Sequence, residues 1–384
     1  MEDSKKTFLF LITAGGLISY LAKMLIPPLL IILQTEFSLS NFEAGLLMTG
    51  YMVGYAIAQI PSGLLGEKLG RKNIIFAGMI GSYTATLFIA FSTTYLHVLI
   101  LRIIFGFLAG NYFTPASSML AQNFTEKERG FAQGFLMLGV PAGTALAPLV
   151  AMPLAAHYGW RLSFLVTALA GYVVSVLFWV FIQDREEKTH MRDQFIWSNR
   201  IFFLGVATVF SACAVWGFLT FFPKFLTFNG LNDQEVTLLY FLLSAIGVVS
   251  VPFVGRVSDR YGRFTVLVLI FSVLSLACLG FMFVPPEISL LVLLIIPTGI
   301  VIYGNVPPLM AFAADLSHSK ARGFWIGYIN TMAFIGAAVG SAVGGKILDL
   351  YSFSTLFGFF IGMICIALFL YGSKIRRSGP SQGP

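Results

Sequence analysis

Long apolar stretches separated by polar breaks run through the whole chain. Each stretch has about 20 residues or more, which is long enough to cross a lipid bilayer. Because only a helix satisfies its own backbone hydrogen bonds inside lipid, the pattern predicts an all-α polytopic membrane protein. The twelve predicted spans are 7–33, 42–66, 74–92, 96–122, 130–155, 162–183, 200–222, 235–257, 264–284, 287–314, 322–347 and 350–373.

Composition and charge agree with this pattern. With 57% hydrophobic and 11% charged residues, the chain is too apolar for a soluble domain. If the predicted spans alternate in direction, 19 of the 24 Lys and Arg residues fall on the side of the N-terminus. Such an excess marks the cytoplasmic side, so we expect both termini in the cytoplasm and the spans in the plasma membrane. Membrane topology therefore explains the net charge of +7 better than nucleic-acid binding does.

A nine-residue pattern occurs twice, once in each half of the chain. Gly63–Arg71 recurs as Gly255–Arg263, and the offset of 192 residues is half of the 384-residue length. A duplicated membrane unit is typical of transporters built from two similar halves. The predicted units are a six-helix bundle over 1–183, a cytoplasmic linker over 184–199, a second six-helix bundle over 200–373 and a cytoplasmic tail over 374–384.

These features resemble the major facilitator superfamily over essentially the whole chain. Gly63–Lys72 matches the signature G-x-x-x-D-R-x-G-R-[KR] except that Glu67 replaces the usual Asp, and Arg102 to Gly106 matches R-x-x-x-G in the fourth span. The resemblance implies two pseudo-symmetric six-helix bundles, alternating access and a monomer. Within the superfamily, Gly54–Gly63 most resembles the anion:cation symporters, which carry organic anions such as sugar acids and organophosphates.

The chain departs from that branch at its acidic positions. Ala22-Lys23 stands where the branch usually has Asp-Arg, and Ala109 stands where an acid is common. The other acidic residues fall at the ends of spans or in loops. A proton-coupled symporter normally needs a titrating group in its cavity. The sequence therefore indicates a uniporter, an anion exchanger, or coupling through a site outside this pattern.

Two cations inside predicted spans are the main candidates for substrate binding. Lys23 lies somewhat beyond the middle of the first span, where a charge costs about 3 kcal/mol or more in lipid. Arg102 lies about two turns, or roughly 9 Å, into the fourth span, so both can share one depth. Two cations on one cavity repel unless an anion neutralises them, which predicts binding of a carboxylate or phosphate. Alternatively, Lys23 extends to the membrane surface, and Arg102 holds helices together through backbone carbonyls.

Uncharged polar residues inside the spans complete the predicted cavity. Amides in apolar helices are costly unless they find a partner, so each of them either lines the cavity or hydrogen-bonds between helices. Tyr55 and Asn330 match positions that often line the cavity in anion carriers. The full predicted lining set is Tyr51, Tyr55, Gln59, Asn111, Gln133, Asn305 and Asn330.

By the same resemblance, the two repeated loops form a gate at the cytoplasmic face. An acid there can face the positive N-terminal end of a helix in the other half. Glu67 would face the start of the eleventh span near Gly323, and Asp259 would face the start of the fifth span near Gly130. Alternatively, these loops only fix the topology through their positive charge. The predicted gating residues are Glu67, Lys68, Gly70, Arg71, Arg129, Asp259, Arg260, Gly262, Arg263 and Arg322.

The sequence predicts a transporter and not an enzyme. Its three cysteines lie in apolar spans at no metal-ligand spacing, and no catalytic cluster stands out, so we expect no metal and no cofactor. The expected partners are a small organic anion, possible coupling ions and membrane lipid, without nucleic acid. A multidrug or lipid exporter is the alternative within the superfamily. A non-transporting receptor or sensor on the same scaffold is the alternative of another class.

Overall fold

The structure is a computed structural model that describes residues 2–183, 197–285, 287–318 and 322–375. All the regular secondary structure of the described part is helical, which confirms the predicted fold class. Its helices are α1 (Glu2–Lys23), α2 (Ile26–Phe37), α3 (Asn41–Leu69), α4 (Arg71–Ala90), α5 (Tyr95–Asn123), α6 (Glu126–Tyr158), α7 (Trp160–Phe181), α8 (Asn199–Phe228), α9 (Asp233–Tyr261), α10 (Arg263–Phe283), α11 (Ile288–Gly304), α12 (Val306–Leu316), α13 (Arg322–Leu350), α14 (Phe353–Leu370) and the π-helix η2 (Tyr371–Ile375).

These helices form twelve membrane-length segments, because α2 continues α1, α12 continues α11 and η2 continues α14. Among the described residues, eleven segments are long and apolar enough to cross a membrane. The twelfth, α3, has 29 residues and packs against α5 and α13. Large apolar side chains such as Val180 and Phe369 are exposed on the flanks, where a soluble protein would carry polar groups. The flanks are therefore suited to lipid.

Two of the predicted spans each consist of two consecutive helices, and each pair of helices still forms one membrane-length segment, Lys5–Phe37 and Ile288–Leu316. The span over 7–33 breaks at Met24 and Leu25, and the span over 287–314 breaks at Asn305. In both cases the second helix begins with an apolar residue followed by two prolines, Pro27-Pro28 and Pro307-Pro308. Proline fits the first turn of a helix but removes a hydrogen bond from the turn before it. A pair of prolines therefore breaks one span in each half, the first span of the N-terminal half and the span α11–α12 of the C-terminal half.

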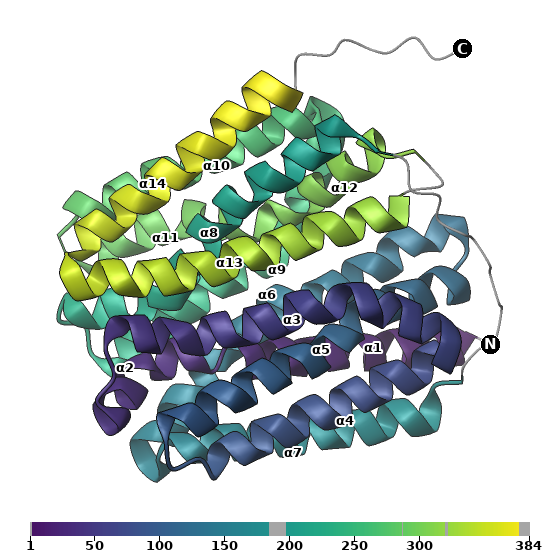
Figure 1. Ribbon diagram of the computed structural model, residues 1–384, viewed down its shortest axis with the longest axis horizontal. Coiled ribbons are helices and arrows are strands. Elements are labelled where there is room, and N and C mark those ends of the chain that lie inside the picture. Colours follow the sequence, from purple (N-terminus) through teal and green to yellow (C-terminus); the bar gives the residue numbers. More distant parts are fainter. Residues whose placement is uncertain (1, 184–196, 286, 319–321, 376–384) are drawn as a thin grey trace.

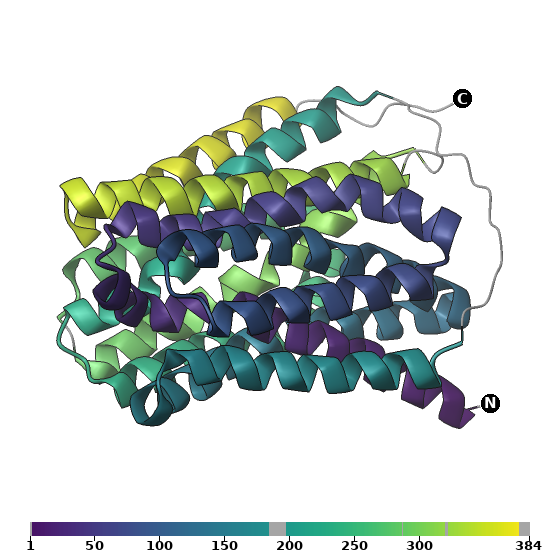
Figure 2. The ribbon, with the colours of Figure 1, turned by 60° about the horizontal axis from the view of Figure 1, so that its bottom comes forward.

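The helices form two bundles that lie side by side, α1–α7 and α8–η2 (Figures 1 and 2). The start of α1 and the end of η2 lie at the same end of the molecule, which we call the terminal end; the opposite end is the distal end (Figure 1). Three helix pairs join the halves: α3 packs on α13, α6 packs on α9, and α2 packs on α8 less extensively. A central site must therefore be lined by these seams and the helices beside them.

The repeated nine-residue segments end in the same turn. Gly70, between α3 and α4, has φ 87° and ψ 134°, and Gly262, between α9 and α10, has φ 89° and ψ 133°. This positive φ favours glycine because a Cβ would clash with the backbone. A single left-handed residue thus reverses the chain at the terminal end of each half, and both motif glycines serve this turn.

Close packing of α5 on α3 gives a test of the fold. A Cβ added at Gly106 would overlap the backbone carbonyl of Tyr51, whereas one added at Gly362 meets no atom within 4 Å. We expect Gly106→Ala to force the two helices apart and to lower the free energy of unfolding by about 1–3 kcal/mol. Gly362→Ala should leave stability unchanged or raise it, because alanine is the better helix former. Thermal unfolding of the detergent-purified variants would measure both, and equal midpoints would contradict the packing.

Candidate functional site

The break between α1 and α2 places a buried lysine and frees a backbone carbonyl. α1 ends at Lys23, and α2 begins at Ile26. In a continuous helix the carbonyl of Lys23 would accept from the N–H of residue 27, but Pro27 has none. An unpaired carbonyl buried in a membrane protein costs several kcal/mol, so this one needs another donor.

Arg102 of α5 supplies that donor. Its Nη2 donates to the carbonyl of Lys23 at 3.0 Å, and its Nη1 donates to the carbonyl of Ala22 at 3.4 Å. Its Nε donates to the carbonyl of Leu47 in α3 at 3.2 Å, and the side chain is 1% exposed. The guanidinium therefore ties the broken first span to α3 and α5. Substrate contact by Arg102 stays a prediction, while its recorded hydrogen bonds match the helix-holding alternative.

The amine of Lys23 lies between two aromatic rings. Its Nζ is 4.1 Å from the ring centroid of Tyr20 and 4.3 Å from that of Tyr55, and the residue is 2% exposed. Both rings offer cation–π attraction, but neither offers a negative charge. Among the described residues, none is recorded as a hydrogen-bond acceptor or an ionic partner of this amine. Lys23 is thus a buried cation held by aromatic faces, and it does not extend to the membrane surface.

Further polar groups lie on the face of α3 that carries Tyr55. Tyr51, Tyr55 and Gln59 are spaced four residues apart, so they lie one above the other on this helix. The hydroxyl of Tyr51 and the amide nitrogen of Gln59 are buried without a hydrogen-bond partner. Buried polar groups are normally paired, so unpaired groups of this kind require an explanation. Like Lys23, both can donate a hydrogen bond, which a bound anion could accept.

Aromatic residues of the other half close this site. The ring of Tyr55 lies 4.2 Å, centroid to centroid, from that of Phe334 in α13, and Phe334 lies 6.1 Å from Trp216 in α8. Asn330 is partly buried one helical turn before Phe334. Sequence reasoning missed Tyr20, Phe334 and Trp216 as site residues. Tyr20 and Phe334 could have been found by their helical spacing from Lys23 and Asn330, but this spacing does not separate them from the many aromatic residues that only pack. Trp216, in α8, carries no such signal.

The remaining lining candidates have hydrogen-bond partners within the protein. The amide nitrogen of Gln133 in α6 donates to the carbonyl and hydroxyl oxygens of Ser117 in α5, both at 2.9 Å. The other two bond to their own helices. The amide nitrogen of Asn111 donates to the carbonyls of Phe107 at 2.9 Å and Leu108 at 3.3 Å. The amide of Asn305 donates in the same manner to the carbonyls of Val301, at 3.4 Å, and Ile302. Asn305 sits at the break before Pro307 and Pro308, where donors are missing. These hydrogen bonds offset the cost of placing a polar group in an apolar helix. Cavity lining by either asparagine stays a prediction.

The described gating candidates make contacts within their own halves. Arg263 pairs with Asp259 at 3.5 Å and with Asp315 of α12 at 2.7 Å. The guanidinium of Arg260 lies 5.5 Å from the ring centroid of Tyr261. Lys68 is exposed and Arg71 is partly buried at the terminal end. The side chains of Glu67, Arg129 and Arg322 lie outside the described residues. A latch from Asp259 to the start of α6 stays a prediction.

The start of α6 is instead tied to α1. Nζ of Lys5 donates to the carboxylate of Glu128 at 2.9 Å. This hydrogen bond and those from the N–H and hydroxyl of Thr125 lower the pKa of Glu128 to about 2. Because the folded-state pKa is depressed, this contact is present at neutral pH and is lost as the pH falls toward 2.

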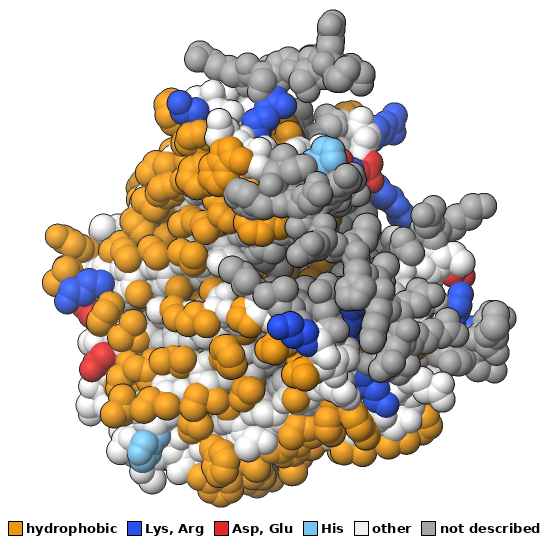
Figure 3. Space-filling view, turned by 45° about the vertical axis from the view of Figure 1, so that its right-hand side comes forward, with side chains coloured by type: hydrophobic (Ala, Val, Ile, Leu, Met, Phe, Trp, Pro, Cys, Tyr) orange, Lys and Arg blue, Asp and Glu red, His pale blue; other side chains and the backbone are white. Residues whose placement is uncertain are grey.

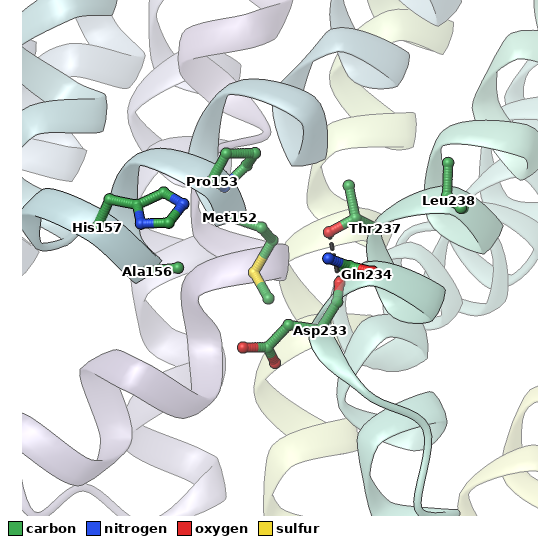
Figure 4. Close-up of a pocket in the computed structure, with 8 residues that line it drawn as sticks. All are labelled: Met152, Pro153, Ala156, His157, Asp233, Gln234, Thr237 and Leu238. Atoms are coloured by element: carbon green, nitrogen blue, oxygen red, sulfur yellow. Dashed lines mark hydrogen bonds between the residues drawn. The ribbon is translucent and has the colours of Figure 1, made fainter.

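Two cavities lie away from Lys23, near the distal end. One, of about 360 Å³, lies between α6 and α9 and is lined by four apolar and four polar residues, the polar ones being His157, Asp233, Gln234 and Thr237 (Figure 4). The other, of about 370 Å³, lies between α2 and α8 and contains Gln34 and Lys224. Lys23 itself is buried, and the contact of Tyr55 with Phe334 lies beside it at the seam of the two halves.

Fold and site together define a polytopic carrier with a buried cation beside the seam of two similar halves. Residues 12–306 and 205–383 match the sequence profile of the Major Facilitator Superfamily, so the chain belongs to this family of transporters.

Individual relatives point to different substrates. A hexuronate transporter of Bacillus subtilis (strain 168) is 25% identical over 100% of this chain and 96% of that protein. The multidrug resistance protein MdtG of Salmonella typhi is also 25% identical, over 89% of this chain and 88% of that protein. The crystal structure of a bacterial homologue of the human lysosomal transporter Spinster, inward-facing and occupied, has a TM-score of 0.82 at 16% identity over 97% of both chains. This likeness supports the fold.

The hydrogen bonds of Arg102 predict that its loss destabilises the protein without any ligand. Arg102→Lys keeps the charge but cannot reach three carbonyls with one planar fork. We expect both Arg102→Lys and Arg102→Leu to lower the free energy of unfolding by about 3 kcal/mol or more, since buried carbonyls lose their donors. Thermal unfolding of ligand-free protein measures this. Full stability of Arg102→Lys would show that charge alone is needed.

Proposed function

We propose that this transporter carries a small organic anion, such as a carboxylate, a sugar acid or an organophosphate, and binds it at Lys23. The observation that supports this most directly is the buried amine of Lys23, which has cation–π partners but no recorded anion. A ligand carboxylate or phosphate would neutralise it and would accept a charge-assisted hydrogen bond. The unpaired donors of Tyr51 and Gln59 favour a ligand rich in oxygen acceptors. Likeness to the hexuronate transporter supports the same class of ligand.

The transport cycle in this proposal is alternating access. A ligand at Lys23 would have to part the ring of Tyr55 from that of Phe334, which belong to different halves. Binding and separation of the halves are therefore coupled. When the ligand binds, its negative charge takes the place of the aromatic rings around the amine of Lys23, and the contact of Tyr55 with Phe334 that closes the empty site is lost. The carrier can then rock about the site and open to one side at a time.

Charge supports one orientation of the carrier in the membrane. Several Lys and Arg side chains lie around the terminal end, whereas hydrophobic side chains dominate the flank next to it (Figure 3). Following the excess of positive charge, we propose that the terminal end faces the cytoplasm and the distal end faces outward. The described acidic side chains lie at helix ends, away from Lys23. We therefore propose facilitated or exchange transport rather than proton coupling through a carboxylate in the cavity.

An exporter of drugs is the second candidate, because MdtG is as similar in identity as the hexuronate transporter. A site for lipophilic cations would be expected to hold an acid among its aromatic residues. Here the central ion is a lysine. This difference favours the anion proposal.

The role of Lys23 predicts opposite effects of its removal on two quantities, the stability of the ligand-free protein and the stabilisation by an anion. Lys23→Met should leave the ligand-free protein as stable or more stable, because it removes a buried charge without an ionic partner. The same change should abolish stabilisation by the substrate anion, which at 100 Kd amounts to about 2.7 kcal/mol in the original protein. Thermal unfolding is measured with monocarboxylates, dicarboxylates, sugar acids, organophosphates and lipophilic cations. Uptake of the stabilising anion into proteoliposomes then tests transport.

A second lysine provides the control for this experiment. Lys346 of α13 is exposed, so Lys346→Met removes the same charge without touching the site. It should keep both anion stabilisation and uptake. Stabilisation by lipophilic cations alone would contradict the anion proposal and favour the exporter. Anion stabilisation that persists in Lys23→Met would place the binding site elsewhere.

A further inference from the structure

We propose that Asp349 and Lys224 grip the start of α3 and so form the gate that closes this carrier at its distal end. Both residues belong to the C-terminal half, whereas α3 belongs to the N-terminal half. The proposal concerns the transport cycle and holds whatever the substrate is. It assigns a role to charged residues that the sequence placed only at the ends of spans.

Asp349, near the end of α13, binds the first two backbone amides of α3. The N–H of Asn41 donates to Oδ1 of Asp349 at 2.6 Å, and the N–H of Phe42 donates to Oδ2 at 3.0 Å. These amides have no partner within their own helix. The positive end of the α3 dipole also favours a carboxylate at this position. One side chain of the C-terminal half therefore makes two charge-assisted hydrogen bonds to the N-terminal half.

Lys224, in α8, binds the side chain of Asn41, whose backbone amide is held by Asp349. Its Nζ donates to Oδ1 of Asn41 and to Oε1 of Gln34, the latter at 2.5 Å. Gln34 lies in α2 and in turn donates from Nε2 to Oδ1 of Asn41 at 3.1 Å. Asn41 is thus held at its N–H by Asp349 and at its amide oxygen by Lys224. The two ions bring opposite charges to one point of contact.

Close backbone packing continues from this grip down the α3–α13 seam. A Cβ added at Gly345 would overlap the carbonyl of Asn41, and one added at Gly45 would overlap the carbonyl of Ser341. Farther along, the hydroxyl of Thr49 donates to the carbonyl of Ala338 at 2.9 Å. The two halves are therefore in contact from the distal end toward the depth of Tyr55 and Phe334. Opening a path from the distal end to Lys23 requires this seam to part.

The grip can be released without unfolding α3. Ser40 and Glu43 form a capping box that holds the start of the helix by itself. When Asp349 moves away, the N–H groups of Asn41 and Phe42 face water, which can accept from them. The contact is therefore strong enough to bias the conformation and is still exchangeable. This is the behaviour that a gate needs.

The grip also has a counterpart among the sequence predictions. α3 and α13 run in opposite directions, so each helix begins beside the end of the other (Figure 1). At the distal end the acid of α13 binds the start of α3. At the terminal end we predict the reverse, with Glu67 near the end of α3 facing the start of α13. Halves that rock as rigid bodies separate at one end as they close at the other, so the two latches would alternate.

Distance measurements between spin labels test the gate without any substrate. Labels on Thr93→Cys and Pro285→Cys report on the distal end, since both residues are exposed there, in the loops α4–α5 and α10–α11 of different halves. The three native cysteines are replaced in this background. We expect Asp349→Ala to raise the population with a long distance by about tenfold, because two hydrogen bonds to a charged group are lost. Asp349→Asn and Lys224→Met should shift it in the same direction.

Glu235→Gln is the matched control. Glu235 is also an acid at the distal end that caps a helix start, but it binds Asn232 of its own helix, α9. Its loss should leave the distance between the labels unchanged. If Asp349→Ala and Lys224→Met keep the original distance distribution, the gate is refuted. An equal shift in Glu235→Gln would show a general loosening of the distal end and would also refute it. Neither result bears on anion binding at Lys23.

Discussion

The hydrogen bonds of Arg102 to the broken first span are the interaction on which the rest of the site depends. Pro27 removes the donor that the carbonyl of Lys23 would have within a helix, and Arg102 replaces it from α5. The same guanidinium holds α3 through Leu47. Three helices that carry Arg102, Lys23 and Tyr55 thus share one anchor. Without it, a break at this depth in lipid would leave a buried carbonyl unpaired.

This arrangement separates the tasks of the two buried cations. Arg102 donates its N–H groups to backbone carbonyls, whereas the recorded contacts of the Lys23 amine are with aromatic rings. The sequence suggested two cations acting alike on one anion. In the structure one of them builds the site and the other is left with its charge unmatched, and this difference makes Lys23 the centre of the proposed function. The cost of burying that charge is the reason a ligand anion would be favoured there.

The distal end shows the kind of contact that the family resemblance predicts for the other end. An acid on the start of a helix in the opposite half joins the halves while the contact is made and leaves only exchangeable amides when it breaks. Between the ends, glycine-lined packing of α3 on α13 and the contact of Tyr55 with Phe334 transmit the position of one half to the other. In the proposed cycle, the charged contacts at the surface and the aromatic contact at the centre would open and close together.

The sequence by itself determined the class of protein and the number of spans, because crossing lipid demands about 20 apolar residues each time. It also revealed the two halves through the repeat, and it singled out Lys23, since a charge inside a span is costly. Only the tertiary structure decided what each charge touches. Asp349 binds Asn41 across 308 residues of sequence, and Arg102 meets Lys23 across 79. Neither pair has a local pattern, because such contacts depend on which helices pack and at what depth. The prolines that break the helices could be read from the sequence, but the side chain that binds the freed carbonyl, Arg102, could not.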